Sequence, residues 1–337
     1  MKNPRAKNNF VGRTCSITGV GSYVPERVLT NADLEKMVET TDEWITTRTG
    51  IKERRLAAAD EFTSDIAAKA AQRAMVMAGI TADQIDLIIV ATITPDMPFP
   101  NTACLVQQKI GARRIPAFDI EAACSGFIYA LEVGQNFITA RTYETVLVIG
   151  AEKLSSITNW KDRNTCVLFG DGAGAAILQN RPLSHGLLTT ALGADGGKAE
   201  LLSMPGGGSR CPASAQSVLD GLHFLRMDGK ETFKNAVQAM CSAANEVLSR
   251  CEIDITKIKC VIPHQANRRI IDAVGERLGA TPEQLFVNLH KYGNTSAASV
   301  AIALDEAVRS GKVQRGDLIL IVGFGAGLTW GAAIIEW

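Results

Sequence analysis

The chain of 337 residues is long enough for one large domain or two fused ones, and 46% of it is hydrophobic while 21% is charged. Lysine plus arginine and aspartate plus glutamate balance at 35 each, so we expect neither nucleic acid nor an anionic membrane as a partner. The eight cysteines form no CxxC pair and no apolar segment follows the basic N-terminus, which predicts a cytoplasmic protein without a disulfide framework or a signal peptide.

Short apolar runs alternate with helical patterns along the chain, which predicts α/β layers. Several runs are apolar throughout, as strands covered on both faces must be. The predicted strands span 15–20, 86–92, 117–120, 145–150, 174–178, 259–263, 318–323 and 331–337, and the clearest helical patterns span 64–79 and 125–140.

Two stretches need separate interpretation. Residues 318–335 carry no charge and have the length of a membrane span, but four glycines interrupt them. We therefore interpret this stretch as two buried strands joined by a glycine-rich turn, and expect no membrane span. The stretch 204–217 is rich in glycine, proline and serine, which predicts a loop at the surface or over a site entrance.

The order of the predicted elements repeats along the chain. Two pairs of apolar runs share an offset of 172 residues, namely the run at 88 with the run at 260 and the run at 146 with the run at 318 (260 − 88 and 318 − 146). A glycine-rich turn and a strand containing AAI follow in each half, which predicts two similar halves. The alternative is chance, because apolar strands resemble one another.

Cys124 lies between the predicted strand 117–120 and the helical pattern that begins at 125. The N–H groups and dipole of a helix N-terminus favour a thiolate, and the amide of Cys124 itself would point toward an oxyanion on an attacked acyl group. The alternative is a buried structural cysteine, which is how we interpret the other seven. The 172-residue offset places Ser296, in a second glycine-containing turn before a helix, opposite Cys124.

Histidine and amide candidates lie in the second half. His264 follows a predicted strand, and Asn294 lies in a turn close to His290. A cysteine nucleophile needs a histidine base and an orienting or oxyanion-stabilising amide, but packing, helix capping and turn formation explain these residues equally well. His185 and His223 are predicted at the surface. No metal-ligand spacing and no complete nucleotide-binding motif is present in the sequence.

Taken together, the motifs resemble the β-ketoacyl-[acyl-carrier-protein] synthase III family, the initiating condensing enzymes of bacterial fatty acid synthesis in the thiolase superfamily. The resemblance runs nearly end to end, and its most specific parts are TTDEWITTRTGIKERR (40–55), AACSGF (122–127), RNTCVLFGDGAGAA (163–176), PHQAN (263–267) and KYGNTSAAS (291–299). It implies a thiolase-like five-layered αβαβα fold built from two halves, residues 1–183 with the nucleophile and residues 184–337 with the histidine and the asparagine.

The resemblance implies a role for each matching residue. Cys124 matches the nucleophile, His264 and Asn294 match the other two catalytic residues, and the N–H groups of Cys124 and Ala326 match the oxyanion hole. The matches to coenzyme A contacts are Trp44, Arg48, Arg163 and Asn267. The remaining matches are Phe99, which implies a homodimer because it lines the acyl pocket of the opposite subunit, and Arg269 and Lys234, which dock the acyl carrier protein.

The implied reaction is the decarboxylative condensation of an acyl-coenzyme A, by default acetyl-coenzyme A, with malonyl-carrier protein, without a metal or redox cofactor. Two positions depart from the family: Ala326 replaces a common glycine, and Glu276 replaces a basic docking residue of some members. The alternatives are a related condensing enzyme of secondary metabolism, a hydroxymethylglutaryl-coenzyme A synthase, and a non-catalytic subunit that binds acyl carriers. The second needs an acidic base near the cysteine, and Glu121 is close in sequence but does not lie in that family's motif context.

Overall fold

The computed structural model describes residues 14–181 and 186–337. Its strands are β1 (Thr14–Tyr23), β2 (Arg27–Thr30), β3 (Glu53–Leu56), β4 (Leu87–Ala91), β5 (Ala117–Ile120), β6 (Thr145–Glu152), β7 (Gly172–Arg181), β8 (Gly186–Ala194), β9 (Leu202–Ser203), β10 (Arg226–Met227), β11 (Cys260–Pro263), β12 (Leu318–Gly325) and β13 (Thr329–Glu336). Its α-helices are α1 (Asn31–Leu34), α2 (Asp42–Thr49), α3 (Thr63–Ala78), α4 (Thr102–Lys109), α5 (Gly126–Thr139), α6 (Arg163–Cys166), α7 (Ala215–Leu219), α8 (Gly229–Cys251), α9 (Arg268–Leu278), α10 (Leu289–Tyr292) and α11 (Ala298–Arg309).

The two large sheets share one strand plan. The first has the order β1-β7-β6-β4-β5 and the second the order β8-β13-β12-β11. In each sheet one side is parallel (β6, β4 and β5 in the first, β12 and β11 in the second), and the strands on the other side pair antiparallel. The offset seen in the sequence recurs, because β8 and α11 begin 172 residues after β1 and α5 (186 − 14 and 298 − 126). The predicted boundary between residues 183 and 184 lies outside the described residues.

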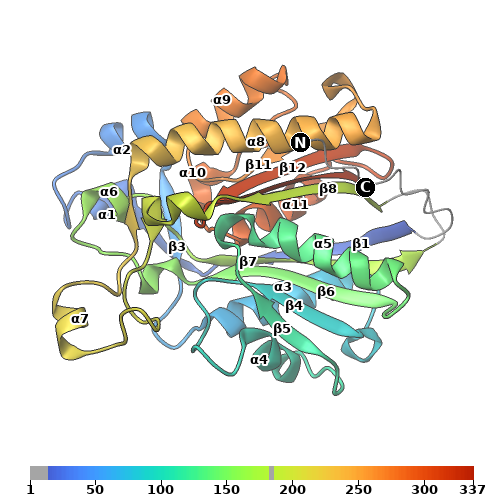
Figure 1. The fold of residues 1–337 in the computed structure, drawn as a ribbon, viewed down its shortest axis with the longest axis horizontal. Helices are drawn as coiled ribbons and strands as arrows, with labels where there is room; N and C mark the ends of the chain where they lie inside the picture. The colour runs from blue at the N-terminus through green and yellow to red at the C-terminus, as the bar shows by residue number, and fades with distance from the viewer. Residues whose placement is uncertain (1–13, 182–185) are drawn as a thin grey trace.

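Helices form three layers around the two sheets (Figure 1). Helices α3 and α4 cover the outer face of the first sheet, α5 and α11 lie between the sheets, and α8 and α9 cover the outer face of the second. Neighbouring residues of a strand enter different layers: in β12, Ile319 and Ile321 face the central helices while Leu320 and Val322 face α8. This arrangement explains why the strands are apolar throughout.

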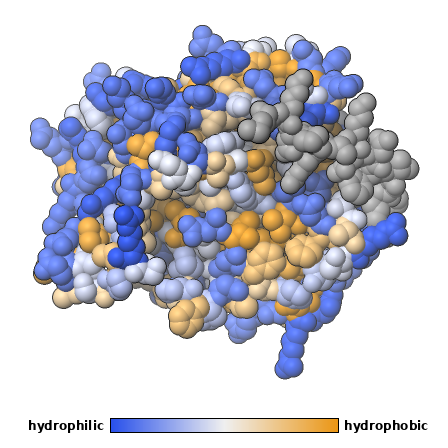
Figure 2. All heavy atoms as spheres, viewed as in Figure 1, coloured by the Kyte–Doolittle hydropathy of each residue, from blue (hydrophilic) through white to orange (hydrophobic). Residues whose placement is uncertain are grey.

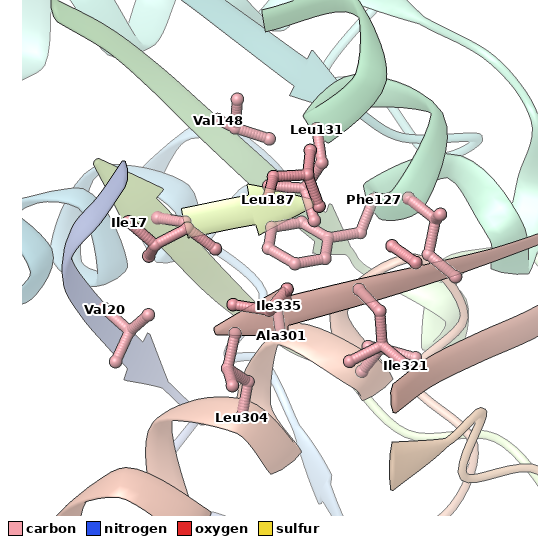
Figure 3. Close-up of a cluster of buried hydrophobic side chains, with 14 of the residues drawn as sticks. Ile17, Val20, Phe127, Leu131, Val148, Leu187, Ala301, Leu304, Ile321 and Ile335 are labelled. Carbon is pink, nitrogen blue, oxygen red and sulfur yellow. The ribbon is translucent and has the colours of Figure 1, made fainter. Parts of the chain in front are cut away.

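The central layer holds the two helices that follow the predicted catalytic turns. Phe127 and Leu131 of α5 meet Ala301 and Leu304 of α11 in one buried cluster, together with Ile321 of β12 (Figure 3). Each large side chain buried there contributes about 1.5–3 kcal/mol to folding. The cluster therefore fixes the N-termini of α5 and α11 relative to each other.

The structure differs from the sequence prediction in several elements. Strands β2, β3 and β8 were not predicted, because they are short or carry polar residues on an exposed face. The predicted loop 204–217 ends in a short helix, α7, at Ala215. His223 is partly buried rather than at the surface, and its ring lies 3.9 Å from the ring of Phe224. His185 lies outside the described residues.

The stretch 318–335 forms two strands, as predicted. They are β12 and β13, which pair antiparallel in the second sheet. Across residues 14–181 and 186–337, no helix is both long and apolar enough to cross a membrane.

Gly150 marks the closest approach of α11 to the first sheet. A Cβ added there would lie 2.3 Å from the carbonyl oxygen of Ala297, just before α11. We expect Gly150→Ala to lower the free energy of unfolding by about 1–3 kcal/mol, because the helix must shift away from β6. Gly196→Ala is the control, since an added Cβ meets nothing within 4 Å there. Equal denaturation midpoints for the two variants would contradict this packing.

Candidate active site

Cys124 lies in a strained junction between β5 and α5. It is the middle residue of a 3-10 turn, Ala123–Ser125, and Ala123 has a φ of 44°, a left-handed conformation that is uncommon for alanine. The hydroxyl of Thr329, at the start of β13, lies 2.9 Å from the carbonyl oxygens of both Ala122 and Ala326. One side chain thus links the Cys124 turn to the glycine-rich turn between β12 and β13.

The Cys124 thiol is enclosed by its surroundings. The residue is 7% exposed, and burial raises the pKa of the thiol to about 12. A hydrogen bond with the Ser296 side chain lowers this pKa, and the charge of Glu152 raises it. The sequence predicted a thiolate favoured by the helix N-terminus, but burial opposes that effect. The resting thiol therefore holds its proton at neutral pH, and its activation requires a proton acceptor.

The turn before α11 holds both Asn294 and Ser296. The Oδ1 atom of the Asn294 side chain accepts a hydrogen bond from the backbone N–H of Ser296 at 2.8 Å. The backbone N–H of Asn294 donates to the Leu168 carbonyl at 2.8 Å. Ser296 has a φ of 47°, so this junction repeats the strained geometry of Ala123. Because Oδ1 faces a backbone donor, the side-chain NH2 group of Asn294 is left to donate to a ligand.

His264 follows β11, and its ring is held by α11. Its Nδ1 atom lies 2.6 Å from the Ser299 hydroxyl, and the backbone N–H of Gln265 also donates to that hydroxyl at 3.4 Å. We assign the hydroxyl proton to the bond with Nδ1, which places the proton of the neutral ring on Nε2. Burial lowers the pKa of His264 to about 4, so the ring is neutral at physiological pH and donates from Nε2.

The segment 294–299 connects the three candidate catalytic residues. It contains Asn294, it bonds Cys124 through Ser296, and it bonds His264 through Ser299. The end of β12 also packs against the site, because a Cβ on Gly325, its last residue, would lie 2.5 Å from the backbone nitrogen of Cys124. The Cys124 thiol thus lies where the ends of the two sheets and the turns before α5 and α11, which are far apart in sequence, come together.

The four residues predicted to contact coenzyme A also lie together. The guanidinium carbons of Arg48 and Arg163 lie 4.8 Å and 4.9 Å from the centre of the Trp44 ring. The Asn267 side chain, at the start of α9, donates to the Arg48 carbonyl at 3.2 Å. A half-buried aromatic ring with two cations beside it suits a flat group that carries phosphates.

The remaining predicted residues lie at the surface. Arg269 and Glu276 are exposed on α9, Lys234 is exposed on α8, and these helices pack against each other. Phe99, in the loop between β4 and α4, is 84% exposed. Glu121, the base of one rival interpretation, is also exposed.

Several residues of the site were missed by the sequence analysis. Ser296 was found only as the counterpart of Cys124, and Ser299, Thr329 and Glu152 were not singled out. The one available signal was the end of the run TVLVIGAE (145–152), where a carboxylate follows an apolar strand. The strand was predicted to stop at Gly150, which left Glu152 outside it.

Comparison with known proteins identifies the family. The family described as 3-oxoacyl-[acyl-carrier-protein] synthase III matches residues 118–196, and its C-terminal part matches residues 248–337. A β-ketoacyl-[acyl-carrier-protein] synthase III of Caldanaerobacter subterraneus subsp. tengcongensis is 58% identical over 95% of this chain and 97% of its own length. The chain belongs to the 3-oxoacyl-[acyl-carrier-protein] synthase III family.

Other members of the synthase III family agree over the same length. The one from Symbiobacterium thermophilum is 54% identical over 96% of this chain and 98% of its own. The crystal structure of the synthase III from Aquifex aeolicus VF5 matches with a TM-score of 0.90 and 50% identity, over 96% of this chain and all of that one (100%). These matches confirm the predicted thiolase-like fold, and they establish the chain as a condensing acyltransferase.

Proposed function

We propose that this synthase III condenses an acyl-coenzyme A primer with malonyl-carrier protein through an acyl group carried on Cys124. The product is a 3-oxoacyl-carrier protein, with release of carbon dioxide, which is the initiating condensation of fatty acid synthesis. The observation that supports it most is the segment 294–299, which joins one thiol to one amide donor and one neutral histidine.

The first half-reaction transfers the acyl group. The Cys124 sulfur attacks the thioester carbonyl, and the N–H groups of Cys124 and Ala326 stabilise the oxyanion. The close approach of Gly325 to the Cys124 amide supports this assignment, because it brings the two backbone segments against each other. Coenzyme A leaves, and Cys124 keeps the acyl group as a thioester.

The second half-reaction makes the carbon–carbon bond. The Asn294 NH2 group and the His264 Nε2–H donate to the thioester oxygen of malonyl-carrier protein, so that loss of carbon dioxide gives a stabilised enolate. The enolate carbon attacks the acyl-cysteine. Two neutral donors suit this step, because burial keeps the His264 ring uncharged in the physiological range and the Asn294 side chain does not titrate. Decarboxylation supplies the carbon nucleophile, so no resident metal or redox cofactor is required.

Substrate binding follows from the surface chemistry. Trp44, Arg48 and Arg163 would stack on and pair with the adenine and phosphates of coenzyme A, with Asn267 beside them. Arg269 and Lys234, exposed on adjacent helices, would receive the acidic carrier protein. Glu276 lies on the same helix as Arg269, so we expect carrier docking to be weaker at that end.

A homodimer completes the proposal. Strand β5 is an edge strand of the first sheet, and its four residues are only half-buried. Phe99 is 84% exposed and lies two residues before Asn101, whose side chain donates to the Ala117 carbonyl of β5. Hydrophobic side chains also gather over α5 in Figure 2. Pairing of two copies at this edge would cover these surfaces and bring Phe99 to the acyl pocket of the partner.

Intact-protein mass spectrometry tests the proposal. The chain is mixed with a panel of acyl-coenzyme A thioesters of different lengths, beside Cys124→Ala and Cys104→Ala. We expect one acyl group on the unmodified chain and on Cys104→Ala, whose thiol is exposed, but none on Cys124→Ala. The preferred thioester then identifies the primer. Acylation of Cys124→Ala, or no acylation from any thioester, would contradict the proposal.

A further inference from the structure

Glu152 is a fully buried carboxyl group beside the proposed nucleophile. It is the last residue of β6, and its oxygens accept hydrogen bonds from the Thr94 hydroxyl at 2.6 Å, the Thr92 hydroxyl at 3.2 Å and the Ile93 amide at 3.1 Å. The Ser296 hydroxyl donates to its Oε1 atom at 3.1 Å. The fold therefore isolates one carboxyl group from solvent, with hydroxyl and amide partners only.

Ser296 connects this carboxyl group to the thiol. Its side chain bonds both Cys124 and Glu152, and the charge of Glu152 acts on the Cys124 thiol. Its amide is held by Asn294, and its strained backbone fixes the hydroxyl between the two groups. A hydroxyl that accepts from S–H while it donates to a carboxylate can pass a proton along the line.

We propose that Glu152 is the proton acceptor for Cys124, acting through the Ser296 hydroxyl. This inference rests on the proposed role of Cys124. On acyl transfer, the thiol proton moves to Ser296 and the hydroxyl proton of Ser296 moves to Glu152. The sulfur attacks the thioester, and the coenzyme A thiolate leaves and takes a proton from solvent. After condensation the Cys124 thiolate is expelled, and Glu152 returns the proton by the same route.

The protonation behaviour of Glu152 suits this role. Burial raises the pKa of its carboxyl to about 7, and hydrogen bonds from Thr94, Ile93 and Ser296 oppose part of that rise. A carboxyl with this pKa is divided between both forms at neutral pH, which is where a general base works best. His264 is less suited to accept the thiol proton, because its pKa of about 4 makes it a weak base and Ser299 bonds its Nδ1 atom.

The charged side chains that neighbour Glu152 along the chain and in the sheet form hydrogen bonds with other groups. The Lys153 ammonium bonds the carbonyl oxygens of Ala58 and Glu61 at 2.8 Å and 2.7 Å. The Asp171 carboxylate, which precedes the β7 residue paired with Glu152, accepts from Ser155 at 2.8 Å and 2.6 Å. Among the described residues, the hydrogen-bond partners of the Glu152 carboxyl are therefore uncharged, and its charge acts on the Cys124 thiol.

The test compares the pH dependence of Cys124 in matched variants. For the unmodified chain, the rates of acylation by the preferred thioester and of alkylation by iodoacetamide should rise through an inflection near pH 7, as Glu152 loses its proton. Glu152→Gln and Ser296→Ala should each lose this inflection and react about 100-fold more slowly at pH 7.5. Asp171→Asn, which removes another buried carboxyl, should keep the inflection.

A second measurement does not depend on activity. A raised carboxyl pKa favours the folded state while the proton is bound, so Glu152 contributes stability that is lost as pH rises from 4.5 to about 7. The lowered pKa of His264 acts in the opposite sense over much of this range, so the contribution of Glu152 is measured as the difference in melting temperature between the unmodified chain and Glu152→Gln. The melting temperature of Glu152→Gln should lack this loss, because an amide does not titrate.

The outcomes separate the relay from the proposed function. If a folded Glu152→Gln or Ser296→Ala keeps the inflection and reacts within threefold of the unmodified chain, the relay is wrong even though Cys124 is acylated. If no thioester acylates Cys124, the proposed function is wrong. Alkylation then still decides the relay, because iodoacetamide needs no coenzyme A site.

Discussion

Replacing Asn294 by aspartate is expected to slow the decarboxylation of malonyl-carrier protein by about 10²–10³-fold, while acyl transfer to Cys124 changes only a few-fold. Aspartate keeps the oxygen that accepts from the Ser296 amide, so the turn before α11 is preserved. It removes the NH2 donor that would stabilise the enolate and puts a carboxylate in its place. The variant thus separates the two half-reactions, which Asn294→Ala does less cleanly because it also releases Ser296.

Two assays measure this separation. Acyl transfer is followed by mass spectrometry of the acyl-enzyme, and decarboxylation by release of carbon dioxide from malonyl-carrier protein. Asn288→Asp is the matched control, since Asn288 is a buried amide whose NH2 group donates to Glu306 instead. In Asn288→Asp, acyl transfer and decarboxylation should change by the same factor. An equal fall of both half-reactions in a folded Asn294→Asp would show that Asn294 has no specific role in decarboxylation.

Replacing Arg54 by methionine is expected to lower the free energy of unfolding by about 3–5 kcal/mol. Arg54 is 0% exposed, and its guanidinium donates to the carbonyls of Leu29 and Val167 and to the Asn31 side chain, at 3.3, 2.7 and 2.8 Å. Burial lowers its pKa to about 10, so it remains charged at neutral pH. Methionine fills the volume but leaves these three acceptors without the guanidinium donor. The total free energy of unfolding of a domain is only about 5–15 kcal/mol, so the loss is a large part of it.

Removal of the Arg54 guanidinium should also disturb the active site. The Arg54 guanidinium donates to the Val167 carbonyl, and the carbonyl of the next residue, Leu168, accepts from the backbone N–H of Asn294, so Arg54 supports the turn that carries Asn294. Arg55→Met is the control, because Arg55 makes only a loose contact of 3.5 Å with Glu53, worth about 0–1 kcal/mol. Chemical denaturation measures both variants. If Arg54→Met unfolds at the same denaturant concentration as Arg55→Met, the guanidinium is not structural.

The sequence by itself determined the buried central strands, the helices that follow the two catalytic turns and the location of the nucleophile candidate, but not the strands β2, β3 and β8. Uniformly apolar runs marked strands buried on both faces, and these became the centres of the two sheets. The offset of 172 residues predicted Ser296 as the counterpart of Cys124 in the second half. The motifs around Trp44 and Asn294 identified the family, because their order along the chain is specific to it.

The tertiary structure alone decided the electrostatics of the site. The bonds of Ser296 with Cys124 and Glu152 join residues 172 and 144 positions apart (296 − 124 and 296 − 152), and no local pattern encodes such contacts. The thiol was predicted to ionise readily because a helix N-terminus is a local feature that sequence reveals. Its burial is not local, since it arises only when two sheets and the helices α5 and α11 close around it, and that desolvation raises the pKa of Cys124 to about 12.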